Sequence, residues 1–274
     1  MAETVFKRKL YNEILEWKKN RSDKYALLIK GARRVGKSTI AEEFAKNEFR
    51  SYILIDFAHT SKAILELFDD TYNLDFFFLQ LQQLTGVRLY EKESVIIFDE
   101  VQLLPKARQA IKYLVADGRY KYIETGSFLS IRKNTKDILI PSEEHKISMY
   151  PMDFEEFLWA VGDEITADTI KLLLKSKKSA GNAMHRNLMR MFRLYMLIGG
   201  MPQAVEAYLE HNNPKGDKIN PIEVKSGNYR GHKSLDMFCD KYSSRIRDKY
   251  VVHTKDYKWE NGIHYLPVYM IPFL

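Results

Sequence analysis

Residues 25–39, YALLIKGARRVGKST, decide the fold class of this chain. The stretch opens with a short apolar run at residues 25–30, which has the length of a strand, and the residues that follow it continue in a pattern typical of a helix. A glycine-containing loop separates the two. Gly31 and Gly36 bracket four residues and Lys37-Ser38 follows, so the loop matches G-x-x-x-x-G-K-[ST] in full.

This order of strand, glycine loop and helix suits the binding of phosphate groups. The glycines let the loop wrap so that backbone N–H groups face phosphate oxygens, and the helix directs its positive dipole end at the same anion. Lys37 is placed to reach the β- and γ-phosphates, and the Ser38 hydroxyl to ligate Mg²⁺. We therefore predict that ATP and Mg²⁺ bind here. The predicted nucleotide-binding residues are Gly31, Ala32, Arg33, Arg34, Val35, Gly36, Lys37, Ser38 and Thr39, although Arg33 and Arg34 could instead face solvent.

A second pair of predicted site residues follows a buried strand. Residues 51–57 form one apolar run, and residues 94–100, SVIIFDE, form another that ends in two acids. P-loop NTPases place an acid at the end of a neighbouring parallel strand, where it meets Mg²⁺. Asp99 fits this metal-binding role, and Glu100 fits the catalytic base that orients or deprotonates the attacking water. Capping of the loop after the strand is the alternative interpretation.

The alternation of strands and helices continues beyond these acids. Residues 61–85 have a helical pattern, residues 105–118 predict a helix, and residues 121–127, KYIETGS, predict a fourth strand. At its end, Thr125 or Ser127 could sense the γ-phosphate or position water as catalytic residues, with simple turn chemistry as the alternative. The pattern predicts an α/β fold: a P-loop parallel sheet with helices on both faces.

Composition bears on the cellular compartment and on the class of binding partner. The 274 residues carry a net charge of +7 and one cysteine, Cys239. A lone cysteine suits the reducing cytoplasm, the N-terminus lacks the apolar core of a signal peptide, and no apolar run has the length of a membrane span. We therefore expect a cytoplasmic protein without a membrane partner. The basic N-terminal third suits phosphate or nucleic acid, but an ordinary solvated, helix-rich surface is the favoured explanation.

Five stretches occur in a fixed order: GARRVGKST, SVIIFDEVQLLP, YIETGSFLS, ISMYPMDFEEFLWAVGD and YMLIGGMPQAV. Together they resemble the AAA+-superfamily ATPases of bacteria and archaea (AAA_14 type) that carry a C-terminal domain of unknown function, DUF4143. The resemblance implies a P-loop ATPase domain at residues 1–150, a helical lid or linker at residues 151–213, and at residues 214–274 a segment similar to PD-(D/E)xK nucleases. It also implies that the chain could form oligomers, as AAA+ relatives often do.

The chain departs from this family in two places. Many relatives carry a Gly-Arg shortly before the equivalent of ISMYPMDF, whereas residues 136–152 here contain no arginine, and Arg132 is the nearest alternative. Without an arginine finger we expect slow hydrolysis, because such a residue contributes about 10³–10⁵ in rate. In addition, only residues 203–220 separate Pro202 from Pro221, where relatives have a far longer segment, so the C-terminal region looks truncated.

That truncation bears on residues 219–227, INPIEVKSG, which place Glu223 and Lys225 on one face of a predicted strand. A PD-(D/E)xK site also needs an upstream acid. Asp217, in a predicted turn, and Glu210, in a helical pattern, are poor candidates for it. We interpret Glu223 and Lys225 as a mark of ancestry rather than as a working nuclease site.

Other polar residues of the C-terminal third have simpler interpretations. Arg186, Arg190 and Arg193 lie in a predicted helix, where they could contact nucleic acid but more often would be solvated. His253 and His264 are isolated, which favours structural roles over metal binding.

The leading hypothesis is an ATP-binding protein, a slow Mg²⁺-dependent ATPase that couples nucleotide state to its C-terminal region and acts on a nucleic-acid or protein partner. One alternative is a nucleotide-binding switch with negligible turnover. Another is a DNA-processing protein with a degenerate nuclease-like segment. A small-molecule kinase is disfavoured, because Asp99 and Glu100 suit the activation of water.

Overall fold

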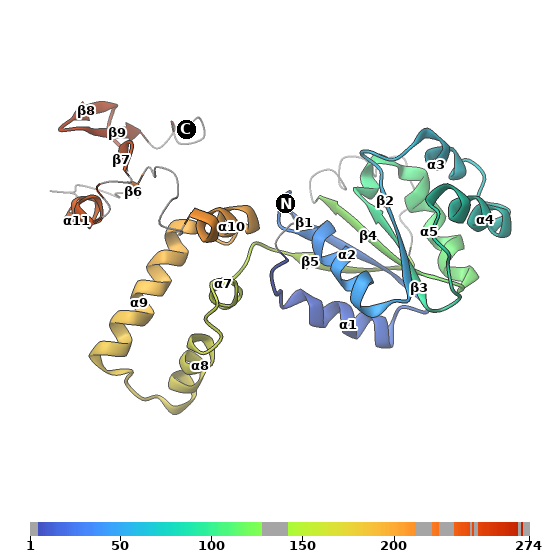
Figure 1. The fold of residues 1–274 in the computed structure, drawn as a ribbon, viewed down its shortest axis with the longest axis horizontal. Coiled ribbons are helices and arrows are strands. Elements are labelled where there is room, and N and C mark those ends of the chain that lie inside the picture. The colour runs from blue at the N-terminus through green and yellow to red at the C-terminus, as the bar shows by residue number, and fades with distance from the viewer. Residues whose placement is uncertain are drawn as a thin grey trace. The chain divides into compact units, whose positions relative to one another are not determined.

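The computed structural model describes residues 5–127, 142–211, 221–224, 233–241, 243, 246–267 and 270 of the chain (Figure 1). Its contacts divide the chain into two compact units, Met1–Tyr208 and Leu209–Leu274. Each unit contains its own β-sheet, and the two are described separately below.

The first unit is built on a five-stranded sheet in which all neighbouring strands are parallel. Its order, β2-β3-β4-β1-β5, places β4 between β1 and β3. Because all strands run the same way, their carboxyl ends lie along one edge, where ligands of α/β proteins bind. The strands are β1 (Ala26–Gly31), β2 (Ser51–Asp56), β3 (Ser94–Asp99), β4 (Lys121–Ser127) and β5 (Glu144–Met149).

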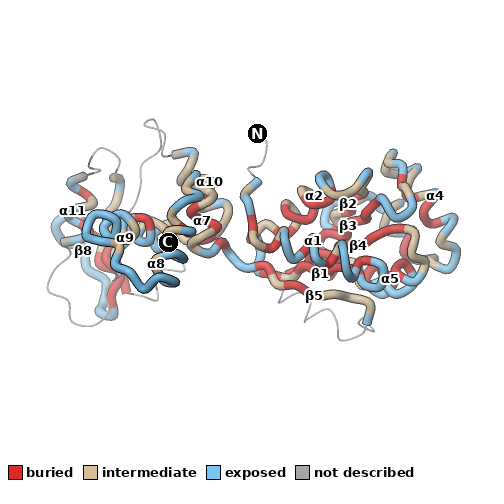
Figure 2. The backbone as a smooth tube through the Cα atoms, turned by 90° about the horizontal axis from the view of Figure 1, so that it is seen from below, coloured by how far each residue is buried: buried red, intermediate tan, exposed pale blue. Residues whose placement is uncertain are grey.

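Helices cover both faces of this sheet, as the sequence predicted. Helix α1 (Leu10–Asn20) and helix α2 (Lys37–Glu48) bury Ile14, Trp17, Ile40 and Phe44 against one face. Helices α3 (Lys62–Leu67), α4 (Leu74–Thr85) and α5 (Pro105–Asp117) close the other. Strands β3 and β4 are consequently buried at every position (Figure 2). This explains the nearly continuous apolar sequence of β3, and it encloses the polar residues of β4, KYIETGS, as well.

The helical pattern at residues 61–85 forms two helices rather than one. Helix α3 ends at Leu67, and α4 begins after Asn73, whose side-chain oxygen accepts a hydrogen bond from the Phe76 N–H at 3.1 Å. The intervening residues, FDDTYN, are rich in side chains that bond to nearby backbone. Asp70 does so, accepting from the Tyr72 N–H at 3.1 Å.

The first unit continues into four more helices. They are α7 (Phe154–Ala160), α8 (Thr166–Ser176), α9 (Gly181–Ile198) and α10 (Pro202–His211), the last of which extends past the boundary at Tyr208. Helix α7 begins with a capping box between Asp153 and Glu156. Phe154 of α7 packs edge-on against Phe192 of α9, with ring centroids 5.2 Å apart. Among the described residues, no helix is long and apolar enough to cross a membrane.

The second unit has a smaller, four-stranded sheet of order β6-β7-β9-β8. Strands β6, β7 and β9 are parallel, and β8 is antiparallel to β9. Its elements are β6 (Ile222–Val224), α11 (Lys233–Lys241), β7 (Lys249–His253), β8 (Lys258–Glu260) and β9 (Ile263–Pro267). The core beneath α11 contains Leu235, Cys239, Val251, Ile263 and Tyr265.

Candidate nucleotide-binding site

The P-loop occupies the tight connection between β1 and α2. A Cβ atom at Gly31 would lie 2.3 Å from the carbonyl oxygen of Met149 on neighbouring β5, so only glycine fits there. Gly36, directly before α2, has a φ of +94°, a conformation that side chains with a Cβ rarely adopt. Arg34 also has a positive φ of 63°, which marks this loop as a sharply turned one.

Lys37 and Ser38 open α2 and lie within this loop. The Lys37 side chain is 5% exposed, and its Nζ donates a hydrogen bond to the Ala32 carbonyl at 3.0 Å. Burial lowers the pKa of Lys37, while the nearby carboxylates of Glu100 and Asp99 partly offset this effect. The ammonium group is thus held inside the curve of the loop, beside two acids.

Asp99, the last residue of β3, accepts hydrogen bonds from one residue of α2 and one of β4. The Ser38 hydroxyl donates to Asp99 Oδ1 at 2.7 Å, and the Thr125 hydroxyl donates to the same oxygen. Thr125 reaches it because β4 lies between β1 and β3. Thr125 also accepts a hydrogen bond from the Glu100 N–H at 3.3 Å. A fully buried threonine thereby fixes both acids at the end of β3.

Glu100 follows β3 in a left-handed conformation, with φ of 53°. Its Oε2 accepts a hydrogen bond from the side-chain amide of Gln102, which is buried in the short helix η1 (Val101–Leu103). The sequence analysis did not identify Gln102. The only available signal was its position two residues after the second acid, which no recognised motif marks.

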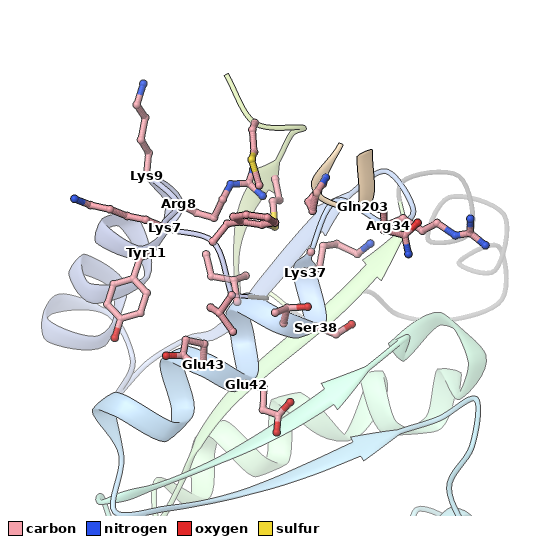
Figure 3. Close-up of a pocket in the computed structure, with 18 of the residues that line it drawn as sticks. Lys7, Arg8, Lys9, Tyr11, Arg34, Lys37, Ser38, Glu42, Glu43 and Gln203 are labelled. Atoms are coloured by element: carbon pink, nitrogen blue, oxygen red, sulfur yellow. The ribbon is translucent and has the colours of Figure 1, made fainter. Parts of the chain in front are cut away.

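A cavity of about 710 Å³ opens in front of these residues (Figure 3). Its volume falls in the range typical of small-molecule sites. Arg34, Gly36, Ser38 and Thr39 line it together with Lys37, Asp99 and Glu100. The segment before α1 and the first turns of α10 complete the wall, with Phe6, Arg8, Pro202, Gln203 and Glu206 among the lining residues.

Not every predicted site residue reaches this cavity. Thr125 and Ser127 lie at the carboxyl end of β4, and Ser127 pairs with Gly31, but neither is among the described residues that line the cavity. Four further predicted residues, Gly31, Ala32, Arg33 and Val35, belong to the loop without lining the cavity. Thr125 is thus placed to hold Asp99 rather than to touch a ligand directly.

Residues 149–152, at the end of β5 and just beyond it, pack tightly against the P-loop on one side and the turn before α10 on the other. A Cβ at Gly200, in the turn between α9 and α10, would lie 2.0 Å from the Met152 carbonyl oxygen. The Met152 N–H donates to the Gly200 carbonyl at 2.7 Å, and the Tyr195 hydroxyl donates to the Met152 carbonyl at 2.9 Å. Gly31 contacts the other end of this segment, at Met149, so glycines permit the close approach on both sides.

The second unit contains fewer candidate functional residues among those that the structure describes. Glu223 lies on β6 opposite Val251, whereas Lys225, Asp217 and also Arg132 of the first unit lie outside the described residues. No group of three or more His, Cys, Asp or Glu side chains able to hold a metal occurs within the described ranges. Glu210 belongs to α10.

The two isolated histidines make structural contacts. His253 Nδ1 accepts a hydrogen bond from the Lys255 N–H at 2.8 Å, and the His264 ring stacks on Tyr250 with centroids 5.1 Å apart. The arginines of α9 are exposed, and Arg190 donates to Asn187 Oδ1 at 3.0 Å.

One comparison with known proteins matches a family within the first unit. Residues 23–158, just under half of the chain, match a family model described as an AAA domain. Among solved structures, the chain is similar to PCH-2 of C. elegans at 13% identity, with a TM-score of 0.38, over 77% of this chain and 64% of that one. A search of the curated proteins found no match. Residues 23–158 are therefore similar to an AAA domain, and the P-loop and Asp99 lie within this matched stretch.

Proposed function

We propose that this chain hydrolyses ATP slowly in a Mg²⁺-dependent reaction and couples its nucleotide state to the region that follows the sheet. The observation that carries the proposal is the convergence of Ser38 and Thr125 on one oxygen of Asp99, beside the buried ammonium of Lys37. This arrangement joins a phosphate-binding loop to a carboxylate at the mouth of a cavity of suitable size.

The first step of the proposed reaction is capture of the triphosphate. The N–H groups of residues 31–37, the Lys37 ammonium and the positive end of α2 would all face the phosphates. The hydroxyl of Ser38 and the carboxylate of Asp99 are oxygen donors of the kind that Mg²⁺ prefers, so the residues present fit this ion. Bound Mg²⁺ would neutralise charge on the phosphate oxygens.

Glu100 would then act as the general base. It lines the cavity, and its backbone N–H is fixed by Thr125. As a water oxygen attacks the γ-phosphorus and the bond to the β-phosphate oxygen breaks, the Glu100 carboxylate would accept the proton of the water. Slow turnover is proposed because residues 136–152 contain no arginine that could serve as a finger.

A nucleotide-binding switch with negligible turnover is the second candidate. The observation that favours it is the hydrogen bond from Gln102 to Glu100 Oε2, which occupies the proposed base. Under this hypothesis ATP would bind tightly and persist. A nuclease function has weaker support, since within the described ranges no metal-binding cluster accompanies Glu223.

Turnover and binding measurements on matched variants test the proposal. For Glu100→Gln we expect ATP binding as in the wild type and a rate reduced about 10²–10⁴-fold, the usual contribution of a general base. Lys37→Ala should lose ATP binding. Glu66→Gln, the same change at an exposed position on α3, should behave as wild type.

Three results would redirect the assignment. Equal turnover in wild type and Glu100→Gln would remove Glu100 from its role. Unchanged ATP affinity in Lys37→Ala would remove the site itself. Tight ATP binding without phosphate release by the wild type would identify the switch.

A nucleic-acid or protein partner and self-association remain proposals, to be tested by mass measurement of the full chain with and without ATP.

A further inference from the structure

Arg8, a residue that the sequence analysis did not identify, lies between the P-loop and the helices that follow the sheet. Its Nη1 donates a hydrogen bond to the Val35 carbonyl at 2.9 Å, and its Nη2 donates to the Tyr150 carbonyl at 2.6 Å. Its Nε lies 3.3 Å from Oε1 of Glu156 in α7. One guanidinium group therefore bridges the loop, the segment after β5 and α7.

The bond to Val35 fixes the direction of one peptide in the phosphate-binding loop. The described residues contain no cis peptide, so the Val35 carbonyl and the Gly36 N–H of the same planar unit point in opposite directions. Because Arg8 holds the carbonyl, the Gly36 N–H must point away from Arg8. Glycine restricts its own backbone least of all residues, so this peptide depends on an external contact for its orientation.

The other two acceptors of Arg8 are themselves held firmly. Tyr150 lies in the short segment whose ends contact Gly31 and Gly200, where a Cβ would collide with a backbone carbonyl. Glu156 accepts hydrogen bonds from the Lys9 N–H at 2.7 Å and from the Asp153 N–H at 3.2 Å. Arg8 is thus anchored on a rigid support on one side and presents its remaining nitrogen to the loop.

Burial makes this contact different from the ion pairs around it. The side chains of Arg8 and Glu156 are 6% and 7% exposed. The surrounding pairs are more exposed: Lys9 lies 2.5 Å from Asp153 and 2.7 Å from Glu155, and Lys171 lies 2.5 Å from Glu155. Removing either buried partner would leave the other charge without compensation, whereas the exposed pairs are replaceable by water.

We propose that Arg8 is a positioning residue for the nucleotide site, and this inference rests on the proposed function. By holding the Val35 carbonyl outward, it keeps the Gly36 N–H directed at the phosphates, and it ties that peptide to α7. Arg8 acts through the loop and does not itself bind the phosphates. Nucleotide bound in the loop and the position of α7 are then connected through one side chain.

Nuclear magnetic resonance of the full-length chain can observe this peptide directly. The sequence contains Val-Gly twice, at residues 35–36 and 161–162. Labelling valine carbonyls with ¹³C and glycine amides with ¹⁵N therefore selects two amide signals, Gly36 and Gly162. Gly162, whose N–H donates to the Trp159 carbonyl at 3.0 Å, reports on the end of α7. ADP should shift the Gly36 signal of the wild type strongly and that of Gly162 less, since Gly162 is affected only through α7.

Variants at both ends of the contact supply the test. In Arg8→Gln we expect ADP affinity to fall about tenfold, the worth of one hydrogen bond, and the Gly36 shift to diminish. Arg8→Lys should restore part of both, because an ammonium group can still donate to the Val35 carbonyl. In Glu156→Gln, Arg8 keeps its bond to Val35, so ADP affinity should change less than in Arg8→Gln. Circular dichroism verifies folding, and Arg8→Lys carries the test if Arg8→Gln does not fold.

The outcomes separate this inference from the proposed function. Loss of ADP binding in Lys37→Ala together with wild-type affinity and a wild-type Gly36 shift in Arg8→Gln would overturn the role of Arg8 alone. Weaker binding in Arg8→Gln with an unchanged Gly36 signal would make Arg8 a direct ligand, which also overturns it. Failure of the wild type to bind ADP, or normal binding by Lys37→Ala, would instead overturn the proposed function.

Discussion

The two parallel sheets of this chain differ in how completely their strands are enclosed. In the first unit, β3 and β4 are buried at every position, and the polar groups at their ends bond to one another. In the second unit, β6 has β7 as its neighbour in the sheet, and its Val224 is 71% exposed. Both sheets carry a recognisable polar motif at a strand. The difference teaches that a motif becomes a site only where neighbouring strands supply its remaining groups.

The largest expected loss of stability follows the removal of a buried charge between α5 and β5. Arg108 of α5 and Glu144 of β5 form a bidentate pair, at 2.7 and 2.8 Å, with side chains 3% and 0% exposed. Arg108→Met should reduce the free energy of unfolding by about 3–5 kcal/mol, because buried Glu144 would keep only the partly exposed Lys146, 3.3 Å away, as a cationic partner. Urea unfolding followed through the fluorescence of buried Trp17 measures this. Arg50→Met, at an exposed pair with Glu93, should cost no more than about 1 kcal/mol.

A smaller loss of stability is expected at Gly200, where the backbone packs directly against that of Met152. Gly200→Ala would place a Cβ 2.0 Å from the Met152 carbonyl oxygen, so the turn must move, at a cost of about 1–3 kcal/mol. Gly86→Ala, at the end of α4, meets no atom within 4 Å and carries only the strain of a left-handed conformation, so it should cost about 1 kcal/mol. Thermal unfolding of both variants compares them. Equal losses would contradict the packing that we describe behind the P-loop.

Glu124 predicts a pH dependence confined to the first unit. Burial raises the pKa of this carboxyl well above its usual range, and the nearby charge of Glu144 adds to the effect, while Arg108 and Lys146 oppose it. The folded state therefore binds the proton more tightly than the unfolded state. Stability should be fully present below the ordinary glutamate pKa and decrease as pH rises from there toward the raised value. Glu124→Gln, which mimics the neutral form, should flatten the dependence of the melting temperature on pH above the ordinary glutamate pKa, and an unchanged pH profile would refute this.

The smallest effect belongs to the open edge of the second sheet. Val224→Thr should change the free energy of unfolding by less than about 0.5 kcal/mol, because the side chain is already largely in water. The equivalent change within the first sheet, Val95→Thr, places a hydroxyl at a fully buried position and should cost about 1–3 kcal/mol. Should both substitutions prove equally costly, the two sheets would not differ in enclosure as we describe.

The sequence predicted β1, β2 and β3 from their apolar runs and β4 from KYIETGS, which ends in small hydroxyl residues. It did not predict β5, because EHKISM lies at the sheet's edge and has only two apolar residues, Ile147 and Met149, while its buried Glu144 reads as a surface residue. In the helical pattern at residues 61–85, local side-chain bonds at Asp70 and Asn73 prevailed over the apolar periodicity. These local competitions are difficult to weigh without the packed structure.

For the candidate site, the sequence identified the residues whose spacing along the chain carries the chemistry. Lys37, Ser38, Asp99 and Glu100 all lie at the cavity that the structure contains. The residues that sequence reasoning missed, Arg8 and Gln102, act on partners through the folded chain: Arg8 contacts carbonyls at positions 35 and 150. Such roles follow from three-dimensional proximity, and no spacing in the sequence encodes them.

Because some charges around α7 are buried and others exposed, they should respond differently to changes in ionic strength. Dissolved salt screens exposed charges over about 8 Å at physiological concentration and affects enclosed pairs much less. High salt should therefore weaken the attractions of Lys9 and Lys171 to the start of α7 while leaving Arg8 bound to Glu156. In saline surroundings, substitutions of the exposed Lys9 and Lys171 should therefore be tolerated, whereas the buried pair of Arg8 and Glu156 should be retained.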